Sequence, residues 1–139
     1  MVYISRKEFF NAAHRLFNPA WSKEQNEAVF GLCANEYFHG HNFELTVTVA
    51  GVPNPETGFV IDLKKLGNII KDKIVDKVDH RNLNMDVDFL KGKMTSCEVL
   101  VQEFWKLLAP EIEQVSTGKL FKITLYETNK NFVEYFGEN

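Results

Sequence analysis

Apolar and polar residues alternate strictly over residues 42–50, which is the pattern of a strand with one buried face. The apolar positions of this run are Phe43, Leu45, Val47 and Val49. An earlier run, 2–13, has apolar residues in one phase at Ile4, Phe10 and Ala12. Near the end of the chain, runs 119–127 and 131–136 flank the turn residues Thr128-Asn129-Lys130 and predict a hairpin. The pattern therefore predicts four strands.

Helical periodicity fills the middle of the chain. Asp62 is a candidate cap for a helix over about 63–77, whose apolar stripe is Leu63, Leu66, Ile70 and Ile74. Thr95-Ser96-Cys97-Glu98 resembles a capping box for a second helix, which we expect to end at Pro110. Its inward residues are Leu100, Val101, Phe104 and Leu108. A short helix is expected within the connection 15–38, where Ser22 and Gln25 suit a start and Gly31 suits a stop.

The order of these elements, ββααββ, predicts an α+β fold. We expect residues 1–139 to form a single domain with a four-stranded antiparallel sheet and two helices packed on one face. Such a sheet has two free edges and one uncovered face. Association between subunits would cover both.

Composition narrows the class of protein. A net charge of −3 without a basic tract argues against nucleic acid as a partner, and no apolar run approaches a membrane span. The first seven residues become charged too early for a signal peptide, and two cysteines are better interpreted as free thiols in a reducing compartment. We therefore expect a cytoplasmic protein.

Three of the four histidines occupy positions suited to a metal. His39 and His41 flank Gly40, and residues two apart on extended backbone point to the same face. A His-x-His triplet is common by chance, but this pair continues the buried phase of the strand that follows, and His14 is in phase with its own buried face. An inward imidazole cluster needs a partner, and three nitrogen ligands with one open position are typical of catalytic zinc.

The two cysteines allow several roles. Cys33 could be a small buried residue, a fourth zinc ligand, or a thiolate base whose pKa is lowered by the metal. Cys97 competes for the thiolate role because the first turn of a helix favours a negative charge. Its capping context favours a structural role or a place in a pocket wall.

Two acidic positions also have alternative interpretations. Asp79 beside His80 could be an acid–base pair or a solvated helix end, and adjacent residues rarely hydrogen-bond each other well. Glu127 continues the phase of Phe121, Ile123 and Leu125. It could form a salt bridge at the rim, or it could anchor a ligand with several N–H donors, such as the amino-pyrimidinone edge of a pterin or guanine.

These segments together closely resemble the 6-pyruvoyl-tetrahydropterin synthase family. The matching segments are Asn11-Ala12-Ala13-His14-Arg15-Leu16, Phe30-Gly31-Leu32-Cys33, His39-Gly40-His41-Asn42, Asp79-His80-Arg81-Asn82-Leu83-Asn84 and Tyr126-Glu127-Thr128. They occur in family order over nearly the whole chain. The resemblance implies the tunnelling (T-) fold, in which trimers close their sheets into a barrel. Two trimers then stack into a homohexamer with active sites between subunits.

The resemblance also implies roles for individual residues. His14, His39 and His41 would bind Zn²⁺, while Cys33 would transfer protons with Asp79 and His80 across a subunit boundary. Glu127 would anchor the pterin, beside Ser96 and Cys97 in the pocket. The family often has hydroxyl residues there, and Cys97 stands in place of a threonine. The implied reaction converts 7,8-dihydroneopterin triphosphate to 6-pyruvoyl-tetrahydropterin with release of triphosphate. Arg15, Arg6 and Lys7 are candidate contacts for the triphosphate.

Two alternatives have sequence arguments of their own. The sister enzyme that makes 6-carboxy-tetrahydropterin for deazaguanine synthesis shares the zinc ligands and the triad. The six-residue step from Cys33 to His39 and the long 15–38 connection look more like the pyruvoyl enzyme. A non-catalytic zinc-binding assembly domain is disfavoured because Cys33, Asp79, His80 and Glu127 are all present.

Overall fold

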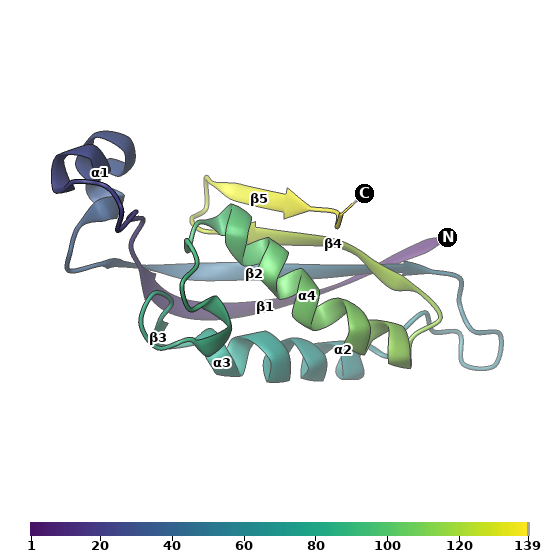
Figure 1. Ribbon diagram of the computed structural model, residues 1–139. Coiled ribbons are helices and arrows are strands. Elements are labelled where there is room, and N and C mark those ends of the chain that lie inside the picture. The colour runs from purple at the N-terminus through teal and green to yellow at the C-terminus, as the bar shows by residue number, and fades with distance from the viewer. Residues whose placement is uncertain (139) are drawn as a thin grey trace.

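The computed structural model describes residues 1–138 and shows an α+β fold built on one five-stranded sheet (Figure 1). The strands lie in the order β3-β1-β2-β4-β5. Their bounds are β1 Val2–His14, β2 His39–Gly51, β3 Arg81–Asn82, β4 Lys119–Tyr126 and β5 Phe132–Tyr135. Strands β1 and β2 pair antiparallel along their whole length, from Val2 opposite Gly51 to His14 opposite His39.

The expected four strands are present, but the prediction of a purely antiparallel sheet was wrong. Strand β3 adds a fifth member, which pairs parallel to β1 opposite Ala12 and Ala13. It comprises only two residues, so its sequence carries no alternation that could have revealed it. Its position matters because it fastens the segment after the first long helix to the end of β1.

The helices account for the rest of the fold. Their bounds are α1 Lys23–Phe30, α2 Leu63–Ile70, α3 Asp76–Val78 and α4 Cys97–Val115. A π-helical turn at Lys71–Val75 joins α2 to α3, and 3₁₀ turns occupy Gly31–Ala34 and Asp88–Leu90. In Figure 1, α2 and α4 lie across one face of the sheet, and α1 stands apart beyond the end of β1 and β2. No helix within residues 1–138 is long and apolar enough to cross a membrane.

The core lies between this helical layer and the sheet. The predicted inward faces of β2 and of the two long helices are confirmed, because their apolar residues are almost completely buried: Phe43, Leu45, Val47, Val49, Leu66, Ile70, Ile74, Leu100, Val101, Phe104 and Leu108. Leu63 is the exception. It is the first residue of α2 and is 46% exposed, so the buried stripe begins at Leu66.

Two boundaries of α4 differ from expectation. Ser96, rather than Thr95, caps the helix, and its Oγ accepts a hydrogen bond from the Val99 amide at 3.4 Å. Cys97 is therefore the first residue of the helix. The helix also continues through Pro110 to Val115. A proline removes one backbone donor, but the buried Ile112 in the next turn packs into the core and favours continuation.

Strand β4 contains an irregularity that changes which face its residues occupy. Leu120 pairs with Val49 and Lys122 pairs with Thr48, so Phe121 is an extra residue in the ladder. Leu120, Ile123 and Leu125 are buried, whereas Phe121 is 37% exposed. The expectation that Phe121 shares the face of Ile123 was wrong, because simple alternation cannot detect a bulge.

Candidate active site

The three predicted histidines meet at one end of the paired strands β1 and β2. Register places His14 directly opposite His39, with His41 two residues further along the same strand. One ligand atom from each ring lies within 4.8 Å of the other two. The prediction that His14, His39 and His41 form one inward cluster is confirmed.

Hydrogen bonding prepares this cluster for a metal. The Nδ1 atom of His14 lies 2.8 Å from the carbonyl oxygen of Thr95, so Nδ1–H donates and the lone pair of Nε2 faces the cluster. Within residues 1–138, His14 Nε2, His39 Nδ1 and His41 Nε2 are buried and have no hydrogen-bond partner. Burial lowers the pKa values of His14 and His39, which favours the neutral imidazoles that bind metals. The residues therefore fit a bound metal ion.

Glu127 lies beside the histidines, just after the end of β4. Its Oε2 is 3.7 Å from His14 Nε2, and its Oε1 is 3.7 Å from His41 Nε2. The side chain is 25% exposed, which leaves the carboxylate accessible to a ligand. Glu127 is thus neither a surface residue nor part of the apolar core.

Cys97 contacts this carboxylate from the start of α4. Its Sγ donates a hydrogen bond of 3.4 Å to Glu127 Oε2. Burial raises the pKa of the Cys97 thiol far above its usual range, and the charge of Glu127 adds to this effect. The raised pKa disfavours the thiolate role considered for Cys97, and its position agrees with a place in the pocket wall. Ser96 precedes it as the half-buried helix cap.

Cys33 is not part of the histidine cluster. It is a half-buried residue of the 3₁₀ turn that follows α1, and its carbonyl oxygen accepts a hydrogen bond from the Leu16 amide at 2.7 Å. The only group of candidate ligands within residues 1–138 consists of the three histidines. The structure does not bring Cys33 to the metal as a fourth ligand.

Asp79 and His80 form a direct pair, contrary to the expectation for neighbouring residues. His80 has a positive φ of 62°, and its Nδ1 lies 3.0 Å from Asp79 Oδ2. The backbone of Asn11 in β1 holds both residues: its amide donates to Asp79 Oδ1 at 2.9 Å, and its carbonyl accepts from the His80 amide at 2.6 Å. The Asn11 hydrogen bond lowers the Asp79 pKa. The His80 side chain is 81% exposed, and no hydrogen bond or ion pair within residues 1–138 joins it to Cys33.

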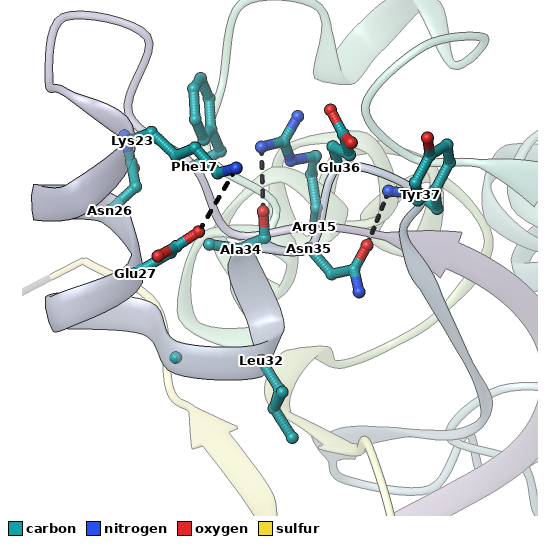
Figure 2. A pocket seen from close by; sticks show the side chains of 11 residues that line it. Arg15, Phe17, Lys23, Asn26, Glu27, Leu32, Ala34, Asn35, Glu36 and Tyr37 are labelled. Carbon is teal, nitrogen blue, oxygen red and sulfur yellow. Dashed lines mark hydrogen bonds and ion pairs between the residues drawn. The ribbon is translucent and has the colours of Figure 1, made fainter.

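A cavity lies elsewhere, between α1, the following 3₁₀ turn and the end of β1 (Figure 2). Its volume is about 730 Å³. Arg15 projects into it, donates through Nη2 to the Ala34 carbonyl at 2.9 Å, and stacks 4.0 Å from the Phe17 ring. The three histidines do not line this cavity. Its size alone therefore does not identify it as the place of chemistry.

Sequence reasoning missed two supports of the site. The Thr95 carbonyl orients His14, and the Asn11 backbone orients Asp79 and His80. Both are main-chain groups, so residue type carries no signal for them. Only the pairing of distant segments reveals these roles.

Comparison with known proteins agrees with this geometry. A sequence model of the family described as 6-pyruvoyl tetrahydropterin synthase matches residues 3–138. The 6-pyruvoyl tetrahydrobiopterin synthase of Dictyostelium discoideum is 37% identical, over 99% of this chain and 97% of that protein. The Homo sapiens protein of the same name is 37% identical, over 97% and 91% of the two chains.

A solved structure supports the fold independently. The Caenorhabditis elegans 6-pyruvoyl tetrahydropterin synthase superposes with a TM-score of 0.87 at 35% identity, covering 99% of this chain and 96% of that one. The extent of these matches, together with the histidine cluster, leads to one conclusion. The chain belongs to the 6-pyruvoyl tetrahydropterin synthase family.

Proposed function

We propose that this protein is a zinc-dependent lyase that converts 7,8-dihydroneopterin triphosphate to 6-pyruvoyl-tetrahydropterin and releases triphosphate. The observation that carries the proposal is the convergence of three unpartnered imidazole nitrogens beside the Glu127 carboxylate. The family membership and the names of its relatives supply the reaction.

His14, His39 and His41 would hold the ion, and an all-nitrogen set with an open position favours zinc. Bound zinc would polarise oxygen atoms of the substrate side chain as a Lewis acid. Glu127 would accept hydrogen bonds from the N–H groups of the pterin ring. Ser96 and Cys97, at the start of α4, would line the same pocket.

Cys33 would move protons between carbon positions of the substrate side chain, assisted by Asp79 and His80. The support for this role is the His80 side chain, which pairs with Asp79 at 3.0 Å and is 81% exposed, so a group of a neighbouring subunit can reach it. Its amide is hydrogen-bonded to the Asn11 carbonyl of β1, which sets the position of the residue at the end of the sheet. We therefore place the triad between Cys33 of one subunit and the Asp79–His80 pair of another.

A homohexamer made of two trimers is the assembly that the family resemblance implies, and the uncovered face of the sheet supports association between subunits. Tyr3, Phe121 and Phe136 form an exposed aromatic group, with ring centroids 4.8 Å and 5.7 Å apart in successive pairs. Tyr3 lies in β1 in the phase opposite to the buried Phe10 and Ala12, and therefore points away from the helical layer. Burial of such aromatic side chains favours association.

Incubation of the zinc-loaded protein with 7,8-dihydroneopterin triphosphate tests the function. The expected product is 6-pyruvoyl-tetrahydropterin, together with one triphosphate per turnover. A 6-carboxy-tetrahydropterin product would instead identify the sister activity. Absence of either product from a protein that retains its zinc would favour a binding module.

A further inference from the structure

Few contacts fix the orientation of the Glu127 carboxylate. The residue lies one position beyond β4 in the turn before β5, where its amide donates to the Asn131 carbonyl at 3.0 Å. Within residues 1–138, the only hydrogen bond to its carboxylate comes from the Cys97 thiol, because the two nearby imidazole nitrogens are 3.7 Å away. The orientation of the carboxylate therefore depends on this sulfur.

Cys97 is well placed to impose an orientation. It is the first residue of α4, is 7% exposed, and follows a capped helix start. Leu100 and Phe104, in the next turns, are completely buried in the core. The thiol is thus attached to a rigid element, whereas Glu127 belongs to a turn.

The sulfur must also be a donor for this contact to be favourable. Burial and the neighbouring carboxylate raise the Cys97 pKa, so the S–H proton is retained. A thiol donating to a charged acceptor forms a stronger hydrogen bond than it does with a neutral one. The contact therefore stabilises one orientation of the carboxylate.

We propose that Cys97 is a positioning residue whose S–H group donates to Glu127 Oε2 and thereby directs the remaining carboxylate lone pairs toward the N–H donors of a pterin. The identity of the ligand rests on the proposed function, whereas the hydrogen bond itself does not. Cys97 acts through Glu127 and need not contact the substrate.

The start of α4 then supports both halves of the site. Two residues before Cys97, the Thr95 carbonyl holds His14 through Nδ1. The Thr95 hydroxyl in turn donates to the Arg15 carbonyl at 3.2 Å. One short segment therefore sets the position of a metal ligand and of the proposed pterin anchor relative to each other.

The matched variants Cys97→Thr and Cys97→Val distinguish the effect of the hydrogen-bond donor from the effect of side-chain shape. Threonine and valine have nearly the same volume, and only threonine has a donor. Fluorescence titration with neopterin should give a Kd about tenfold higher for the valine variant, and within about threefold of the wild-type value for threonine. With 7,8-dihydroneopterin triphosphate as substrate, the Cys97→Val variant should have a higher KM, whereas its kcat should change by less than about twofold. Zinc content should be equal in both variants.

Equal Kd values for the two variants would overturn the proposal. If either branched side chain lowers the folding yield, the smaller pair Cys97→Ser and Cys97→Ala makes the same comparison. The Cys97→Ser variant should then bind neopterin more tightly than the Cys97→Ala variant.

A second measurement does not depend on pterin binding. In a Cys33→Ser background, the infrared S–H stretch arises from Cys97 alone, since the chain has two cysteines. Glu127→Ala should shift this band to the higher frequency of a free thiol, and an unshifted band would refute the hydrogen bond. Failure of wild-type turnover combined with a shifted band would reject the proposed reaction but leave the Cys97–Glu127 contact intact.

Discussion

The imidazole of His14 is bound to the Thr95 carbonyl, 81 residues away in the sequence, through a hydrogen bond of 2.8 Å. This contact commits Nδ1 to the proton and leaves Nε2 for a ligand. Neither residue is exposed to solvent. The fold therefore determines which nitrogen of His14 is available to a metal.

The first prediction concerns pH. Burial disfavours the charged imidazolium and lowers the pKa values of His14 and His39 from 6.5, so both rings are neutral above pH 6.5. Protons should compete with zinc only at lower pH. Competition with a chromophoric chelator should give a zinc affinity that decreases mainly below pH 6.5. A decrease that begins between about pH 8 and 7 would contradict neutral, buried ligands.

The second prediction separates chemistry from metal binding. Cys33→Ala should abolish turnover, because it removes the proposed proton carrier, but it should leave zinc content unchanged, because Cys33 is outside the histidine cluster. Elemental analysis and the product assay measure the two effects on one sample. His14→Ala is the control, since it should lose both. Loss of zinc from the Cys33 variant would identify this cysteine as a ligand.

A third prediction tests the shared triad. Cys33→Ala and His80→Ala should each be inactive alone. If the triad spans two subunits, unfolding the two variants together and refolding them should restore activity in about a quarter of the sites, because each position is filled at random. Mixtures of Cys33→Ala with Cys33→Ser should stay inactive. Absence of recovery in mixed assemblies would place the whole triad within one chain.

A fourth prediction links the core to the metal. The buried Phe43 ring stacks on Phe10 at 4.8 Å and meets the rings of His14 and His41 edge-on at 5.9 Å and 5.6 Å. Phe104 is equally buried and contacts Phe10, at 6.1 Å.

Phe43→Leu and Phe104→Leu should each lower the free energy of unfolding of the zinc-free protein by about 1–3 kcal/mol. Only Phe43→Leu should weaken zinc binding, by about tenfold, because it loosens the ring positions. Denaturant titration and chelator competition measure the two quantities. Equal zinc affinity in both variants would mean that the strands alone orient the histidines.

Most regular elements and two of the helix caps were predictable from the sequence because their signals are local. The alternation in β2 correctly identified its buried face. His39 and His41 are in the same phase, so their orientation could be predicted from it as well. Ser22 and Asp62 cap their helices as expected. What could not be predicted depends on contacts between distant segments or on unusual backbone. The positive φ of His80 brings its ring to Asp79, and no residue pattern announces that conformation.

The bulge in β4 determines where the chain can change length without disturbing the site. Phe121 has no partner in β2, so its deletion would leave Leu120 opposite Val49 and still facing the core. The register from Lys122 to Tyr126 would be unchanged, and Glu127 would keep its place beside His41. Loss of one residue between Lys122 and Tyr126 would instead turn the residues on one side of the deletion to the opposite face. Length variation in this strand is therefore tolerable at a single point, and that point lies outside the segment that positions the carboxylate.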